Sequence, residues 1–156
     1  MAQTIAIESE APPPTAIGWR EWVTLPQLGI AAIRAKVDTG ARSSSLHVDW
    51  IEESIIDGIT SLRFGLRPRK ARGEVVCAAP ALDRRRVTDS SGHSTERWFI
   101  ATTLRLGGQD FDTEINLTSR RTMLFPLLLG RTALQRRFVV DPACSFLCGR
   151  LRRMKS

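Results

Sequence analysis

The sequence predicts an all-β domain, a closed barrel or a sandwich, with one short helix late in the chain. Short β-favouring runs recur along the chain, turn-forming residues separate them regularly, and only one late stretch has helical character. With 156 residues the chain can bury a single core. The hydrophobic fraction of 42% fits a globular protein. No apolar run approaches the roughly 20 residues that cross a bilayer, so no membrane partner is expected.

Three regions are expected along the chain. Residues 1–16, which include three consecutive prolines, predict a flexible leader. Residues 17–149 are expected to form one domain, and residues 150–156 a basic tail. The N-terminal region has no basic start followed by an apolar stretch, so no secretory signal is predicted. Three cysteines cannot all pair within one chain, which indicates free thiols and a cytoplasmic location.

The first half of the chain predicts short strands around a polar loop that begins at Asp38. Ile30–Val37 is expected to be a strand that begins with the apolar run Ile30–Ile33 and ends at this loop. Within residues 46–51, the apolar Leu46, Val48 and Trp50 occupy every second position, which is the period typical of a half-buried strand. The other candidate strands in this half lie within residues 18–28, 61–66 and 75–77.

The second half predicts two hairpins and the short helix. The first hairpin joins strands at residues 86–88 and 95–100. The second joins residues 102–106 to residues 111–117, and residues 132–137 predict one or two helical turns. The remaining candidate strands lie within residues 123–129, 138–140 and 145–147, and the last two are expected to close the sheet.

Two motifs together indicate a candidate functional site. The run Asp38-Thr39-Gly40-Ala41-Arg42 predicts a strand that ends in a tight loop, where glycine permits a positive φ or a close approach of another backbone. A carboxylate on such a loop can act as a catalytic acid or base, although an ordinary Asp-Gly surface turn has the same residues. Late in the chain, Leu127–Leu129 predict an apolar strand that stops at Gly130, before Arg131.

Together the two motifs resemble the two halves of a retropepsin-like aspartic protease. Segments within residues 18–26, 36–47, 87–92 and 121–131 resemble, in that order, one bacterial family. That family is often labelled "ATP-dependent zinc protease" and is associated with ATP-grasp glutamate ligases. The resemblance implies the closed barrel of the acid-protease fold with one short C-terminal helix. It also implies an aspartic-type endopeptidase that hydrolyses peptide or isopeptide bonds.

The chemistry of such an enzyme constrains the assembly. An aspartic protease needs two carboxylates that share one proton, one to activate water and one to polarise the scissile carbonyl. This chain has a single Asp-Thr-Gly, so the second carboxylate requires a homodimer with Asp38 contributed twice. The resemblance further implies that the Thr39 hydroxyl binds the opposing loop and that Gly40 allows the two loops to approach.

By the same resemblance, the late motif supports the catalytic loop. The strand that ends at Leu129 passes beside this loop, and Gly130 and Arg131 follow it. Ala41 belongs to the supporting set but carries no hydroxyl, whereas the pepsin-like pattern has a serine there.

One residue departs from the retroviral pattern. There, the residue after Asp-Thr-Gly-Ala is an aspartate that pairs with the arginine of the Gly-Arg motif, whereas this chain has Arg42. Two alternatives are open. Arg131 pairs with another carboxylate, Asp49 and Asp141 being the candidates, or Arg42 and Arg131 bind an acidic substrate group, for which glutamate-rich peptides are one option.

The first hairpin is a candidate flap. Its turn contains Ser90-Ser91-Gly92, and a hairpin that closes over substrate would place Ser91 and Gly92 at the bound peptide and exclude water. An ordinary solvent-facing hairpin is the alternative interpretation.

The residues give little support for a metal or a cofactor. The chain has two histidines, His47 and His93, and no His-Glu-x-x-His motif. Cys144 and Cys148 could supply two ligands, but two buried thiols are the expectation. His47 is expected to be structural or to support the active loop. No glycine-rich phosphate loop is present, so neither metal nor ATP nor another cofactor is predicted.

The net charge of +7 would attract acidic peptides, ribosomes or nucleic acid. Only 6% of the residues are aromatic and none is tyrosine, which disfavours a base-stacking surface and hence nucleic acid as a partner. The expected partners are a peptide or protein substrate and a second copy of the chain. The alternative from another class is a non-catalytic basic module that binds RNA, the ribosome or a partner ligase, with Asp38 structural.

Overall fold

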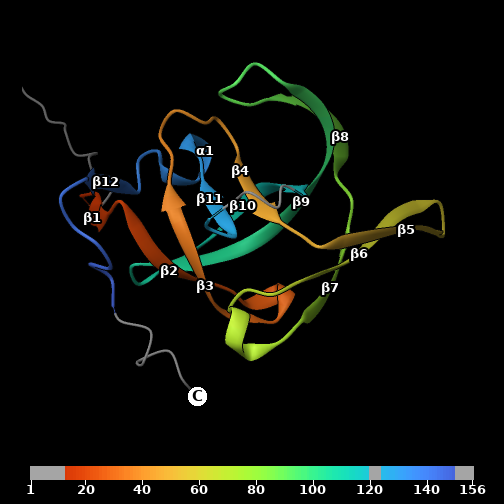
Figure 1. Cartoon of the computed structure of the whole chain (residues 1–156), viewed down its shortest axis with the longest axis horizontal. Helices are drawn as coiled ribbons and strands as arrows, with labels where there is room; N and C mark the ends of the chain where they lie inside the picture. The colour runs from red at the N-terminus through yellow and green to blue at the C-terminus, as the bar shows by residue number, and fades with distance from the viewer. Residues whose placement is uncertain (1–12, 120–123, 150–156) are drawn as a thin grey trace, which may run out of the picture.

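The computed structural model describes residues 13–119 and 124–149, and in this part the chain is an all-β domain with one short α-helix (Figure 1). Its elements are β1 (Thr15–Gly18), β2 (Arg20–Leu25), the 3-10 helix η2 (Pro26–Leu28), β3 (Ile30–Val37), β4 (Ser44–His47), β5 (Trp50–Ile56), β6 (Ile59–Leu66), the 3-10 helix η3 (Lys70–Arg72), β7 (Val75–Pro80), β8 (Asp83–Thr88), β9 (Ser94–Leu106), β10 (Gln109–Thr118), β11 (Leu127–Leu129), α1 (Arg131–Leu134) and β12 (Phe138–Asp141). None of the helices in these ranges is long and apolar enough to cross a membrane.

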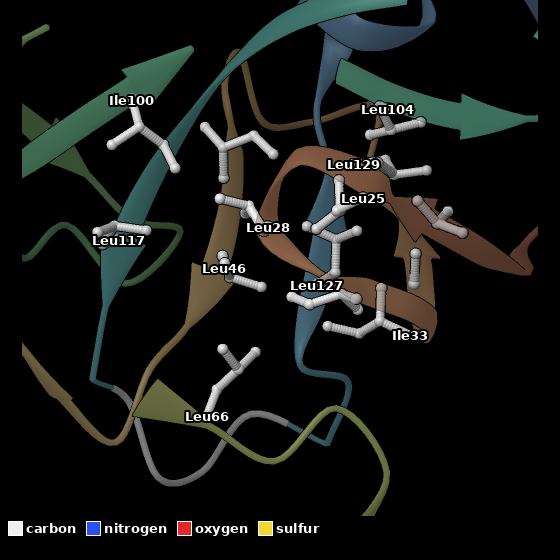
Figure 2. Close-up of a cluster of buried hydrophobic side chains, with 14 of the residues drawn as sticks. Leu25, Leu28, Ile33, Leu46, Leu66, Ile100, Leu104, Leu117, Leu127 and Leu129 are labelled. Carbon is white, nitrogen blue, oxygen red and sulfur yellow. The ribbon is translucent and has the colours of Figure 1, made fainter. Parts of the chain in front are cut away.

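Six strands close into a barrel, which confirms the predicted fold class. They follow the order β10-β4-β11-β3-β2-β9, and the pairing of β9 with β10 completes the ring, while β8 pairs with the free part of β9. β2 shows why such strands form a closed core, because its side chains alternate strictly between buried and half-exposed. Inward-facing leucines and isoleucines fill the interior, including Leu25, Ile33, Leu46, Leu127 and Leu129 (Figure 2).

Two smaller sheets lie outside the barrel. β5, β6 and β7 form an antiparallel three-stranded sheet whose β5–β6 hairpin projects from the barrel in Figure 1. β1 and β12 form a parallel pair that brings the two ends of the described chain together.

Several predicted boundaries were wrong, for identifiable reasons. Residues 46–51 are not one strand, because the chain leaves the barrel after His47 and enters the three-stranded sheet at Trp50. Residues 95–106 are one long strand shared by both hairpins. Residues 145–147 form no strand, and β12, which was also expected to close the sheet, pairs with β1 outside the barrel.

The ends of the domain also differ from the expectation. Thr15 and Ala16, expected in the leader, lie in β1, where they pair with β12. Residues 1–12 of the leader, the basic tail 150–156 and the start of the strand expected at residues 123–129 lie outside the described residues.

A buried carboxylate attaches the C-terminal turn to the barrel. Glu21 faces inward on β2 and is fully buried. Its Oε2 accepts hydrogen bonds from the Gly18 amide at 2.6 Å and the Leu147 amide at 2.9 Å, and its Oε1 accepts one from the Cys148 amide at 3.1 Å. One side chain therefore satisfies three backbone N–H groups, one at the end of β1 and two in the C-terminal turn.

We expect Glu21→Gln to lower the free energy of unfolding by about 2 kcal/mol, because an amide cannot accept all three of these hydrogen bonds. Urea denaturation measures the change. Glu52→Gln is the matched control, because Glu52 is exposed and pairs with exposed Arg63, an interaction worth about 0.5 kcal/mol. Equal losses in the two variants would contradict the structural role of Glu21.

Candidate active site

Asp38 lies where β3 leaves the barrel. Its amide donates to the Leu129 carbonyl at 2.9 Å, which continues the parallel pairing of β3 with β11 by one residue. The Asp38 carbonyl accepts from the Ala41 amide at 3.1 Å, and Oδ1 accepts from the Gly40 amide at 3.1 Å. Asp38 is half-buried, while Thr39 and Gly40 are exposed. The loop thus presents the carboxylate and two small residues on the surface of one subunit.

The segment after β11 holds this loop from behind. The Arg131 amide donates to the Ala41 carbonyl at 2.8 Å, and the Thr132 amide donates to the Arg42 carbonyl at 3.0 Å. The Arg131 guanidinium donates to the Thr39 carbonyl at 3.0 Å. The structure therefore brings together the two motifs that the sequence analysis singled out, although 92 positions separate Thr39 from Arg131.

Gly130 must be a glycine because its backbone lies too close to the Ser43 backbone to leave room for a side chain. Its backbone is extended, with φ −92°, so its conformation suits any residue. A Cβ atom at this position would overlap the Ser43 carbonyl group and lie 2.9 Å from the Arg42 carbonyl oxygen. The Gly130 amide also donates to Ser44 Oγ at 3.0 Å. Glycine thus lets the two backbones touch behind Asp38.

Neither candidate carboxylate pairs with Arg131, so that alternative was wrong. Asp49 lies 3.1 Å from His47 Nε2, and Asp141 accepts from the Ala143 amide at 3.0 Å. Arg131 instead donates to a carbonyl of the Asp38 loop. Arg42 is exposed, and its side chain makes no hydrogen bond or ion pair in the described ranges.

The first predicted hairpin is present as β8 and β9. Asp89 Oδ1 accepts from the amides of Ser91 and His93, both at 3.0 Å, and from Ser91 Oγ at 2.6 Å. Gly92 has a φ of +88°, in the region that favours glycine. In Figure 1 the tip of this hairpin and the loop between β3 and β4 lie at the same end of the view. The substrate-binding role of Ser91 and Gly92 stays a prediction.

The histidine and cysteine candidates lie elsewhere. His47 ends β4 on the side away from the Asp38 loop and, with Val48, Asp49 and Ser119, lines a cavity of about 350 Å³. Its Nδ1 is buried and has no hydrogen-bond partner among the described residues. In that same part of the chain, no group of three or more His, Cys, Asp or Glu side chains is placed to hold a metal ion.

The thiols should react slowly. The expectation that Cys144 and Cys148 are both buried was wrong, because Cys144 is half-buried and Cys148 is exposed. Burial raises the pKa of Cys77 to about 11, partial desolvation and Glu21 raise the pKa of Cys148 to about 11, and a hydrogen bond to Asp141 raises the pKa of Cys144. We expect Cys77 and Cys148 to react with a disulfide reagent at pH 8 about 100-fold more slowly than in the unfolded chain, because only the thiolate attacks. Stability should fall between about pH 9 and 11, where the unfolded thiols ionise first. Equal rates for folded and urea-unfolded protein would contradict this.

The sequence analysis missed a buried polar cluster next to the loop. Arg97 of β9 donates from Nη1 to Asn116 Oδ1 of β10 at 3.0 Å, and Asn116 donates to the Ser44 carbonyl at 2.9 Å. Asn116 and Ser44 are fully buried. The only sequence signal was an asparagine within a predicted strand, and nothing in the pattern pairs it with an arginine 19 positions away.

Comparison with known proteins agrees with this geometry. Residues 16–150 match the family described as RimB-like, retropepsin-like aspartic endopeptidase RimB. The chain belongs to the RimB-like family. This confirms the resemblance to retropepsin-like proteases that the Asp-Thr-Gly and Gly-Arg motifs indicated.

Relatives of this RimB-like chain include two curated proteins named probable alpha-L-glutamate ligase. The one from Shewanella pealeana is 38% identical over 135 residues, and the one from Desulfotalea psychrophila is 40% identical over 135 residues. Each match covers 85% of this chain but only 30% and 29% of the relatives, so the chain spans less than a third of their length.

A solved structure has the same fold. The crystal structure of a protein of unknown function from Legionella pneumophila is 32% identical to this RimB-like chain, with a TM-score of 0.72. The match covers 86% of this chain and 98% of that one.

Proposed function

We propose that this RimB-like chain is an aspartic-type peptidase that acts as a homodimer. The observation that carries the proposal is the Asp38 loop itself, held from behind by Leu129–Thr132 and exposed at Thr39 and Gly40. Two such loops facing each other across a two-fold axis would supply the two carboxylates. One carboxylate would take a proton from water, and the other, protonated, would polarise the scissile carbonyl.

The proposed substrate is an acidic peptide, with glutamate-rich sequences tested first. Arg42 supports this choice, because it is exposed four residues after Asp38 and its guanidinium has no intramolecular partner in the described residues. The net charge of +7 favours acidic ligands in general. The relatives named glutamate ligases suggest glutamate peptides in particular. We further propose a cytoplasmic location, which agrees with three free cysteines.

Cleavage of a mixed peptide set, read by mass spectrometry, tests this function. The set contains glutamate-rich and neutral peptides of equal length, and wild type is assayed with and without a metal chelator beside Asp38→Asn. Cleavage that survives the chelator and disappears in the variant is expected. Cleavage lost with chelator but kept in Asp38→Asn would overturn the Asp38 mechanism and favour a metallopeptidase.

A second candidate function is a non-catalytic module that binds anionic partners. The loop between β6 and β7 favours it, because four basic residues gather there without an ion pair in the described part of the chain: Arg67, Arg69, Lys70 and Arg72. Under this interpretation no peptide is cleaved, and Asp38→Asn leaves partner binding unchanged.

A further inference from the structure

The barrel contains a buried polar cluster that hydrophobic packing does not explain. Asn116 and Ser44 are fully buried, and Arg97 and Ser45 are each 8% exposed. Polar groups in a core destabilise the fold unless their hydrogen bonds are made, and a satisfied network rigidifies the segments it joins. The segments joined here are β9, β10 and the start of β4, which leads directly from the Asp38 loop.

Asn116 occupies the centre of this cluster with a defined orientation. Its Oδ1 accepts from Arg97 Nη1 at 3.0 Å, and its Nδ2 donates to the Ser44 carbonyl at 2.9 Å and to Ser43 Oγ at 3.2 Å. A guanidinium only donates and a carbonyl only accepts, so the partners determine which amide atom faces which side. One face of Asn116 therefore binds the hairpin strand and the other binds the loop.

The hydrogen bonds continue from the loop to Asp38. Ser44 Oγ accepts from the Gly130 amide at 3.0 Å, and the preceding residue, Leu129, accepts from the Asp38 amide at 2.9 Å. Gly130 also packs directly against the Ser43 backbone. A displacement of Ser43–Ser44 would therefore reach both backbones that position the Asp38 carboxylate.

The same hairpin makes other side-chain contacts with β10, and the one made by Arg85 lies close to Asn116. Arg85 of β8 donates to Glu114 Oε1 at 2.7 Å, two residues before Asn116 on β10. Arg85 pairs in register with Arg97, and Glu114 is exposed. The described contacts of Glu114 do not reach the Asp38 loop. Arg85 and Arg97 thus both bind β10 near Asn116, and of these two contacts only the one made by Arg97 continues to the candidate active site.

We propose that Arg97 and Asn116 are positioning residues that couple the β8–β9 hairpin to the geometry of the Asp38 loop. This inference rests on the proposed peptidase function. When the hairpin closes over a substrate, the Arg97–Asn116 contact holds Ser43–Ser44 in the arrangement that orients Asp38. The hairpin position and the catalytic rate are thereby linked through a hydrogen-bonded path in the barrel wall.

Asn116→Asp tests this coupling, because it keeps the contact with Arg97 and removes the contacts with Ser43 and Ser44. The new carboxylate still accepts from Arg97, but it cannot donate to the Ser44 carbonyl or Ser43 Oγ. We expect kcat to fall about tenfold or more with KM changed by less than about threefold, since small displacements of reacting groups are costly in rate. Hydrogen exchange at the Gly130 amide should accelerate, because its acceptor, Ser44, is released. Ser43→Ala removes only the Ser43 Oγ acceptor of Asn116 Nδ2, so we expect a smaller fall of kcat.

Glu114→Gln is the matched control, because it weakens the Arg85 contact with the same strand. It should leave kcat within about twofold of wild type and Gly130 exchange unchanged. A folded Asn116→Asp with wild-type kcat, or equal losses in Asn116→Asp and Glu114→Gln, would overturn the proposal. If wild type cleaves no peptide, the proposed function fails, and hydrogen exchange alone then tests the coupling. Unchanged exchange of the Gly130 amide in Asn116→Asp would refute the coupling.

Discussion

Asp38→Asn is expected to lower kcat for peptide hydrolysis by about three orders of magnitude or more, because asparagine cannot take a proton from the attacking water. The substitution preserves the shape of the side chain, and its carbonyl oxygen can still accept from the Gly40 amide. Stability and oligomeric state should therefore stay as in wild type. The rate of product formation, measured by mass spectrometry, gives the size of the loss.

The same variant also tests the homodimer. If each subunit contributes one Asp38, a variant subunit inactivates the active site that it shares with a wild-type subunit. With a ninefold excess of Asp38→Asn and random pairing, about one wild-type subunit in ten meets another, so activity per wild-type chain should fall about tenfold. Activity that stays constant under this excess would exclude a shared site.

Asp57→Asn is the matched control for both measurements. Asp57 is exposed in the β5–β6 turn, where its φ of +52° suits asparagine equally well. The variant changes the net charge by the same amount but leaves the candidate site intact. It should therefore neither lose activity nor inhibit wild type when added in excess.

Gly130→Ala should be the most destabilising single methyl addition at the site. The new Cβ would overlap the Ser43 carbonyl group, and both neighbours are backbone, which cannot rotate away as a side chain can. We expect the free energy of unfolding to fall by about 3 kcal/mol, with loss of peptide cleavage as the Asp38 loop separates from β11. Urea denaturation and the peptide assay measure the two effects.

Gly58→Ala separates this steric cost from the ordinary cost of replacing a glycine. Gly58 has a φ of +78°, and a methyl group added there would meet no atom within 4 Å, so alanine suffers only backbone strain of about 1 kcal/mol. Gly130→Ala should exceed this loss clearly. Similar losses at the two positions would show that the backbones behind Asp38 can move apart without difficulty.

The elements that the sequence predicted well are those whose signals are local. Ile30–Val37 was predicted residue for residue, because an apolar run ends at a polar turn. The hairpin of β8 and β9 and the helical turn after Gly130 were also identified. The prediction of a strand at residues 145–147 was wrong. The Leu147 and Cys148 amides donate to the Glu21 carboxylate and not to a neighbouring strand.

The sequence by itself determined the fold class of the protein, the positions of most of its strands and the place of Asp38 at a strand exit, because turn chemistry and hydrophobic period act over a few residues. The presence of a single Asp-Thr-Gly also came from the sequence. Only the tertiary structure decided that Arg131 binds the Thr39 carbonyl, that Gly130 touches Ser43, and that Asn116 joins two strands behind the loop. Such contacts join residues far apart in the chain, and they follow from how the barrel closes.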